Sequence, residues 1–216
     1  MWFSSIAFDP DDRRTRALLS NPQRLHAAVM RSCGDTGNNP GRVLWRLDHK
    51  PETLFVVSPA APDLDQLTAQ CGPETKARTT SYDRFLDNLA PGSRWRFRVT
   101  INPVRSLKSV DCDRNKRGKR VALLATSSIE EWLIERSAKA GFAISELEGE
   151  QVVAVTGKQW LDFIKGPDRL RVRVAMAQLE GLLEVADADA LRKTLTSGIG
   201  RARGYGCGLL TLARLR

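Results

Sequence analysis

The sequence has few histidines and few cysteines, and its cysteines are scattered. Of its 216 residues, four are cysteine and two are histidine. No C-x-x-C pair occurs, which argues against a zinc ribbon, and the scattered positions argue against a disulfide framework. We therefore expect a reducing compartment, no histidine-rich metal site and no cofactor. Carboxylates remain the alternative ligands, and they would suit magnesium.

Long apolar runs and a targeting segment are also missing. No apolar run approaches the roughly 20 residues that cross a bilayer. The first residues, MWFSSIAFDPDD, lack the basic and apolar regions of a signal peptide. We expect a cytoplasmic protein that makes no contact with membranes and is a monomer when free.

Acidic residues are outnumbered, and the imbalance is local. The chain has 34 basic and 25 acidic residues, a net charge of +9. Residues 94–120 alone hold ten basic and two acidic residues, 10 − 2 = +8, whereas the rest has 24 basic and 23 acidic residues. A concentrated positive patch is typical of nucleic-acid binding. The alternative is a solvated basic loop.

The order of expected strands and helices occurs twice along the chain. The first half predicts strands and helices at 2–8, 22–33, 42–48, 53–58, 62–71 and 94–102. The second half predicts them at 119–125, 127–141, 142–166, 169–185, 187–198 and 208–215. Both halves follow the β-α-β-β-α-β order of the ferredoxin-like fold. We predict an α+β protein with two tandem ferredoxin-like domains, residues 1–103 and 119–216, joined by a basic linker, residues 104–118.

Capping residues mark where three of the helices should begin. Asn21 precedes Pro22, a favoured first helical residue, and Asp187 precedes the last helix. Ser128 has Glu131 three positions later, which is the capping-box pattern.

Two expected strands carry arginine at every second position. The first holds Arg94, Arg96 and Arg98, and the second holds Arg169, Arg171 and Arg173. Residues i and i+2 of a strand share a face, so each strand presents an arginine face. This favours a groove for a polyanion over an ordinary solvated sheet face. Aromatic residues are sparse on these faces, which favours duplex backbone contact over base stacking.

The segment GIGRARGYGCGLL, residues 198–210, is rich in glycine. Glycine lets backbone N–H groups approach a phosphate closely, although tight turning and packing explain glycines equally well. The segment follows a helix and precedes a strand, and no Lys-Ser or Lys-Thr pair follows the glycines. These features exclude a Rossmann fingerprint and a P-loop. We expect the segment to lie near bound nucleic acid or at the junction of the two domains.

The same segment resembles the C-terminal signature of the type I-E CRISPR pre-crRNA endoribonucleases, the CasE/Cse3 family. Asn102-Pro103-Val104-Arg105 before a basic loop, Leu25-His26 in a helix, and Glu180-Gly181 in a long strand add to the resemblance. The resemblance implies two ferredoxin-like domains and metal-independent cleavage at the 3′ base of the CRISPR repeat hairpin. It also implies retention of the mature crRNA and assembly with other Cascade subunits.

The resemblance also implies site residues. His26 matches the catalytic histidine of the family and projects from the flank of its helix. Gln23 stands where family members often carry tyrosine, and glutamine donates hydrogen bonds but exchanges no proton. Lys165 is the expected electrostatic partner of the phosphate. Tyr82 and Tyr205 are the only tyrosines, and the sequence places neither beside His26.

Charge and position predict the residues that bind RNA. They are Arg105, Lys108, Arg114, Lys116, Arg117, Lys119, Arg120, Arg169, Arg171, Arg201 and Arg203. The glycines expected beside them are Gly198, Gly200, Gly204, Gly206 and Gly208. Two alternatives remain open: a catalytically inactive hairpin-RNA-binding protein of the same fold, and a structural subunit that binds proteins through its sheets.

Overall fold

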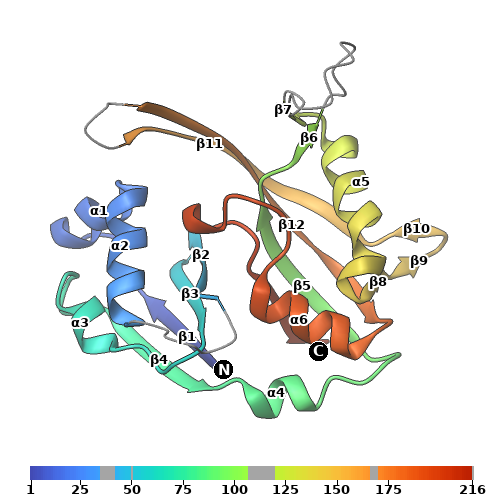
Figure 1. The fold of residues 1–216 in the computed structure, drawn as a ribbon, viewed down its shortest axis with the longest axis horizontal. Coiled ribbons are helices and arrows are strands. Elements are labelled where there is room, and N and C mark those ends of the chain that lie inside the picture. The colour runs from blue at the N-terminus through green and yellow to red at the C-terminus, as the bar shows by residue number, and fades with distance from the viewer. Residues whose placement is uncertain (35–41, 50, 107–119, 166–169, 216) are drawn as a thin grey trace, which may run out of the picture.

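Two antiparallel sheets form the framework of the chain (Figure 1). The computed structural model describes residues 1–34, 42–49, 51–106, 120–165 and 170–215. Helices and antiparallel strands occur in both halves, so the prediction of an α+β fold is confirmed.

The first sheet has the strand order β2-β3-β1-β4. Its strands are β1 (Trp2–Ala7), β2 (Leu44–His49), β3 (Glu52–Ser58) and β4 (Lys76–Ser81). The helices of this unit are α1 (Arg13–Leu19), α2 (Pro22–Ser32) and α3 (Leu64–Thr68). The apolar side chains of α2, Leu25 and Val29 among them, are buried in one cluster with Ile6, Leu54 and Val56 of the sheet. The chain order and the strand order are those of a ferredoxin-like unit.

The second sheet has the order β11-β12-β5-β13, and β8 adds to β12. Its strands are β5 (Arg94–Ile101), β8 (Phe142–Ile144), β11 (Val153–Lys165), β12 (Leu170–Val185) and β13 (Leu210–Arg214). Its helices are α5 (Thr126–Ser137) and α6 (Ala188–Ser197). Along the chain β5, α5, β11, β12, α6 and β13 again follow the ferredoxin-like order. The tandem ferredoxin-like fold is therefore confirmed.

One strand lies in a different sheet from the one we expected. The prediction made residues 94–102 the last strand of the first unit, but β5 pairs with β12 and β13 and opens the second unit. The prediction is wrong because alternation indicates a buried face and not a partner strand. The true last strand of the first unit, β4, pairs with β1. Its sequence, KARTTS, is almost wholly exposed and has no apolar alternation that would mark it.

The strand expected at residues 119–125 is also misplaced. Residues 120–122 form β7 (Arg120–Ala122), which pairs with β6 (Val104–Ser106) in a separate two-stranded sheet. The chain thus passes from the first sheet to the second between β4 and β5, ahead of residue 103. The remaining short elements are α4 (Asp83–Asp87), β9 (Glu146–Leu147), β10 (Glu150–Gln151) and the 3₁₀ turns η1 (Ala138–Ala140) and η2 (Arg203–Tyr205).

Two of the three expected helix caps are confirmed. The Asn21 side chain accepts hydrogen bonds from the N–H groups of Gln23 and Arg24, and Pro22 begins α2. Asp187 caps α6 in the same way. Ser128 is not a cap, because α5 already begins at Thr126, two residues earlier, and makes no side-chain cap bond.

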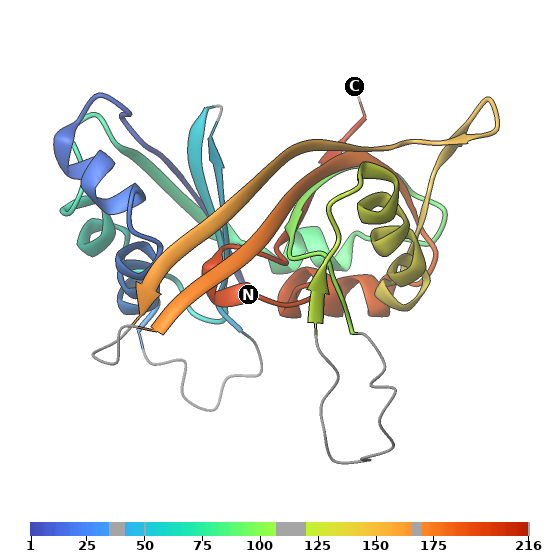
Figure 2. The same cartoon turned by 90° about the horizontal axis from the view of Figure 1, so that it is seen from above.

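The long hairpin of β11 and β12 reaches across to the first unit (Figure 2). Both views place its far end beside α1 and α2. Val174 and Met176 of β12 are buried there with Cys207, and Tyr205 packs against them. The hairpin therefore covers the glycine-rich segment at the junction of the two units.

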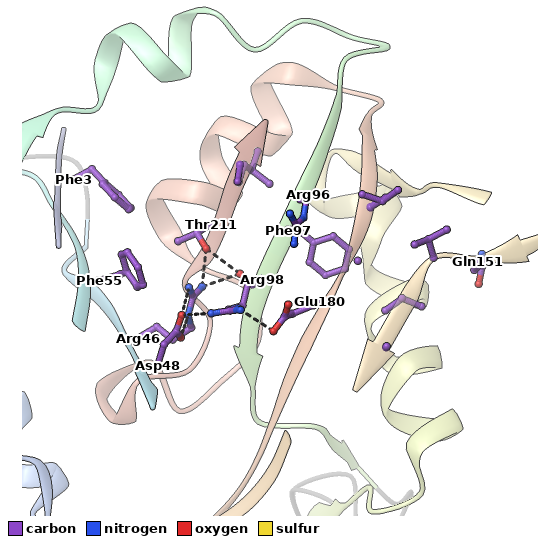
Figure 3. Close-up of a pocket in the computed structure, with 17 residues that line it drawn as sticks. Phe3, Arg46, Asp48, Phe55, Arg96, Phe97, Arg98, Gln151, Glu180 and Thr211 are labelled. Atoms are coloured by element: carbon purple, nitrogen blue, oxygen red, sulfur yellow. Dashed lines mark hydrogen bonds and ion pairs between the residues drawn. The ribbon is translucent and has the colours of Figure 1, made fainter. Parts of the chain in front are cut away.

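A buried ion network joins the two sheets (Figure 3). Arg46 on β2, only 2% exposed, pairs with Asp48 through an Nε–Oδ1 contact of 2.7 Å. Its Nη1 donates to the carbonyl of Arg98 at 2.8 Å, to that of Leu209 at 3.1 Å and to the Thr211 hydroxyl at 2.9 Å. One arginine of the first sheet therefore satisfies acceptors on β5 and β13 and just before β13.

Asp48 links a second arginine to the same network. Arg98 Nη1 donates to Asp48 Oδ2 at 2.8 Å, and Arg98 Nε pairs with Glu180 at 3.0 Å. Burial by itself would raise the pKa of Asp48, but the hydrogen bonds and charges of Arg46 and Arg98 outweigh it and hold the pKa below its ordinary value. The carboxylate is therefore held in its charged form.

Asp48 should make the protein sensitive to acid. The pKa of Asp48 is lower in the folded protein than in the unfolded chain, where it is near 4. The carboxylate therefore stabilises the folded protein fully at pH values above the unfolded-state pKa. This stabilisation is lost as the pH falls through the folded-state pKa. We expect Asp48→Asn to flatten the fall in unfolding free energy below about pH 5, measured by urea unfolding across the acid range. Glu184→Gln, which removes an exposed partner of Arg94, is the control. A variant with the wild-type acid slope would contradict the assignment.

Candidate catalytic site and nucleic-acid interface

His26 lies on α2 at the junction of the two units, half-buried and held by a tryptophan. The indole N–H of Trp45 donates to His26 Nδ1 at 3.3 Å. The two rings are stacked, with centroids 6.4 Å apart and planes 27° apart. Trp45 stands on β2 and is only 3% exposed, so the core of the first unit sets the orientation of the imidazole.

The glycine-rich segment of the second unit packs directly on this pair. Gly206 has φ +82°, and a Cβ at this position would lie 2.7 Å from Cζ3 of Trp45. A Cβ at Gly204 would lie 3.7 Å from both Cε1 and Nε2 of His26. The family signature and the histidine, far apart in the sequence, therefore meet in one place.

The other glycines of the segment serve the fold. Gly198, Gly200 and Gly208 have φ between +77° and +92°, where side chains are disfavoured. Each would also bring a Cβ within 3 Å of a neighbouring atom, and Trp132 is the neighbour at Gly200. Tight turning and close packing therefore account for these three positions.

Gln23 lies on the same helix, one turn before His26. Its side chain is half-buried, and within the described residues its Nε2 has no hydrogen-bond partner. An unpaired buried donor is costly, and such groups are often found where a ligand supplies the acceptor. Gln23 is thus a hydrogen-bond donor near the histidine.

The structure distinguishes the two tyrosines. Tyr82 is buried against Phe3 and Phe85, and this burial raises the pKa of its hydroxyl. Tyr205, in η2, lines a cavity of about 120 Å³ together with Trp45 and packs edge-on against Phe163. Tyr205 is therefore the tyrosine at the junction, and only its place in the glycine-rich segment could have indicated this.

Lys165 is the last residue of β11, where its backbone pairs with Leu170. Its side chain lies outside what the structure describes. Several of the expected RNA-binding residues also lie outside the described residues: Lys108, Arg114, Lys116, Arg117, Lys119 and Arg169.

The described arginines of the predicted set fall into two groups. Three are engaged within the protein: Arg105 lies 3.6 Å from Glu135, Arg171 pairs with Asp162, and Arg203 donates to the Gly198 carbonyl at 2.9 Å. Burial lowers the pKa of the Arg203 guanidinium, and the nearby charge of Arg42 lowers it further. The others, Arg120 and Arg201, line a pocket.

That pocket is basic and contains an aromatic side chain. It has a volume of about 470 Å³ and is lined by Arg120, Arg173, Arg201 and Trp160, among others. The Arg173 guanidinium lies over the Trp160 ring, 4.9 Å from its centroid, and Trp160 is 49% exposed. No sequence pattern singles out Trp160, because β11 carries no alternating arginines. We name these four residues the arginine pocket.

A larger pocket lies elsewhere, between the two sheets (Figure 3). Its volume is about 890 Å³, and Phe3 and Phe55 face Arg96 and Glu180 across it. Neither His26 nor the glycine-rich segment lines this pocket. The candidate catalytic residues therefore lie outside this pocket.

Three further observations concern the metal sites, disulfides and membrane-spanning segments that the composition argued against. Among the described residues, no group of three or more histidines, cysteines or carboxylates could hold a metal ion. The three described cysteines, Cys33, Cys71 and Cys207, are buried and form no disulfide with one another. No helix within the described ranges is long and apolar enough to cross a membrane.

Fold and site together define a tandem ferredoxin-like protein with a histidine at the junction of its two units. The chain belongs to the CRISPR-associated protein family, whose model matches residues 1–214. The CRISPR-associated endoribonuclease Cse3 of Thermus thermophilus is 30% identical over 227 residues, covering 99% of this chain and 100% of the relative. The resemblance inferred from the glycine-rich segment is thereby confirmed.

Solved structures of related proteins are similar to this chain over its whole length. A CRISPR endoribonuclease Cse3 bound to a 19-nucleotide RNA superposes with a TM-score of 0.82 at 28% identity, covering 99% of both chains. A chain of a CRISPR RNA-guided surveillance complex superposes with a TM-score of 0.70 at 28% identity, covering all of both chains.

Proposed function

We propose that the protein is a cytoplasmic, metal-independent endoribonuclease that binds the repeat hairpin of CRISPR transcripts. It cuts at the 3′ base of the stem and keeps the mature crRNA for the Cascade complex. The observation that carries the proposal is the meeting of His26 with the glycine-rich segment in a chain similar throughout its length to an RNA-bound Cse3.

The cleavage uses the RNA's own 2′-OH. Its oxygen attacks the phosphorus and the P–O5′ bond breaks, which leaves a 2′,3′-cyclic phosphate and a 5′-OH. One proton leaves the 2′-OH and one is taken up by the 5′ oxygen. Histidine suits this exchange because it titrates near neutral pH. Gln23 donates a hydrogen bond to a phosphate oxygen, and Lys165 stabilises the charge on the phosphorane.

The arginine pocket supplies part of the RNA-binding surface. Its three arginines come from β7, β12 and the glycine-rich segment, so the fold gathers charge that is dispersed in the sequence. Arginines of this kind contact stem phosphates and set register and affinity rather than read bases. Trp160 adds a half-exposed ring on which a base can stack.

The decisive experiment is cleavage of a labelled repeat hairpin in the presence of EDTA. We expect a product with a 5′-OH and a 2′,3′-cyclic phosphate, and no cleavage when the nucleotide at the cut carries a 2′-deoxyribose. A product with a 5′-phosphate, or activity that EDTA removes, would contradict the mechanism. Tight binding without any product would favour the inactive RNA-binding protein, whose sign in this sequence is Gln23 in place of tyrosine.

The arginine pocket should determine how steeply binding depends on salt. Replacing Arg120, Arg173 and Arg201 together with alanine removes three cations, and the slope of log K against log salt should become shallower by about 2–3 units. Filter binding of an uncleavable 2′-deoxy hairpin at several salt concentrations measures this. Arg94→Ala, at an exposed pair with Glu184, is the control and should leave the slope unchanged. An unchanged slope in the triple variant would mean that the pocket faces away from the RNA.

A further inference from the structure

The two ring nitrogens of His26 have different surroundings. We propose that Trp45 and Gly204 together decide which nitrogen meets the RNA. Trp45 holds Nδ1 as an acceptor, so that the neutral ring carries its hydrogen on Nε2, and Gly204 keeps a side chain off the edge that bears Nε2. The part of this proposal that concerns cleavage rests on the proposed endoribonuclease function, whereas the part that concerns the tautomer does not.

Trp45 acts on the histidine as a hydrogen-bond donor only. An indole has an N–H and no acceptor, so the nitrogen that receives its bond must present a lone pair. The recipient is Nδ1, at 3.3 Å from the indole nitrogen. In a neutral imidazole the other nitrogen, Nε2, then carries the hydrogen.

The position of Trp45 is itself well determined. The indole is buried and stacked on the imidazole, and Gly206 leaves the room that its ring occupies. The next residue on β2, Arg46, is tied to the second sheet by three hydrogen bonds from one nitrogen. The indole N–H thus points at the histidine from a rigid support, as a positioning residue must.

Gly204 is the glycine of the segment whose presence neither a left-handed backbone nor close packing explains. Its φ lies outside the left-handed region, and a Cβ would meet no atom closer than 3.7 Å. The nearest atoms are Cε1 and Nε2 of His26. A methyl group would therefore fit without backbone strain, but it would stand against the Nε2 edge of the ring. What glycine provides at this position is space beside the histidine.

The consequence for the reaction is specific. The neutral His26 meets the scissile phosphate through Nε2 as a hydrogen-bond donor, which stabilises the negative charge that develops there. It can accept the proton of the 2′-OH only after the bond from Trp45 is broken. The arrangement therefore favours His26 as a hydrogen-bond donor to the phosphate, rather than as a base toward the 2′-OH, when the RNA first binds.

The tautomer can be measured without RNA. The chain has only two histidines, so nitrogen NMR of histidine-labelled full-length protein gives two sets of signals, and His49→Gln assigns them. At about pH 8.5, two units above the ordinary histidine pKa, we expect His26 to carry its hydrogen on Nε2. In Trp45→Phe, which keeps a ring but loses the N–H, we expect a mixture of tautomers. Hydrogen on Nδ1 in the wild type, or an unchanged tautomer in a folded Trp45→Phe, would overturn the role of Trp45.

The space at Gly204 is tested by cleavage. We expect Gly204→Ala to slow single-turnover cleavage of saturating hairpin at least about tenfold, with hairpin affinity within about threefold of wild type. Gly157→Ala is the matched control, because a Cβ there also meets only ordinary contacts, to Gln178 at 3.8 Å, and its φ is unstrained. Wild-type cleavage by Gly204→Ala would overturn this part. A wild type that binds but never cleaves would refute the proposed function, and the NMR result would still decide the role of Trp45.

Discussion

His26→Ala should reduce cleavage of the repeat hairpin by about 10²–10⁴-fold, the range that a positioned proton-exchanging group contributes. Affinity for the hairpin should stay within about threefold of wild type, because the role of the imidazole lies in the transition state. The histidine is half-buried on the flank of α2, so alanine removes the ring without opening the cluster around Leu25 and Val29.

Single-turnover cleavage and filter binding of an uncleavable 2′-deoxy hairpin measure the two quantities separately. His49→Ala is the matched control, since His49 is the other histidine of the chain and is exposed at the end of β2. It should cleave at close to the wild-type rate. If affinity and activity collapse together in His26→Ala, the histidine is structural and the catalytic assignment is wrong.

Arg46→Met should lower the free energy of unfolding by about 3–5 kcal/mol, the usual cost of breaking a buried ion pair by removing one partner. Asp48 would keep Arg98 as a partner but lose its closest one, at 2.7 Å. The carbonyls of Arg98 and Leu209 would lose a shared donor. Methionine fills much of the vacated volume, so the loss reports the network rather than a cavity.

Urea unfolding of the full chain measures this loss. Arg94→Met is the control, because its pair with Glu184 is exposed and pairs of this kind contribute about 0–1 kcal/mol. The double variant Arg46→Met/Asp48→Leu should recover part of the stability, since it removes the buried charges together. A loss below about 1 kcal/mol in Arg46→Met would show that the network does not hold the sheets together.

Local patterns in the sequence predicted several elements well. The long alternating run ending at residue 185 is β12, and Asn21 with Pro22 begins α2 as expected. These predictions succeed because alternation and capping depend on residues close in the chain. The polar edge strand β4 has no such pattern, and the helices α1 and α4 also went unpredicted.

The site was predictable only in part. Glycine content located the segment 198–210, the resemblance indicated His26, and charge located a basic region. For Tyr205, the only local indication of a place at the junction was its position in the glycine-rich segment. Nothing local indicated that Trp160 would share a pocket with Arg120, Arg173 and Arg201. These contacts join β7, β11, β12 and the end of the chain, so they follow from how the elements pack.

The sequence by itself determined the family, the α+β class, the caps of α2 and α6 and the histidine on which the proposed chemistry depends. Only the tertiary structure decided that β5 belongs to the second sheet, that Arg46 joins the sheets, and that Gly204 faces Nε2 of His26. The physical reason is that side-chain patterns encode which face of an element is buried. The partner that buries it is chosen by packing between distant segments.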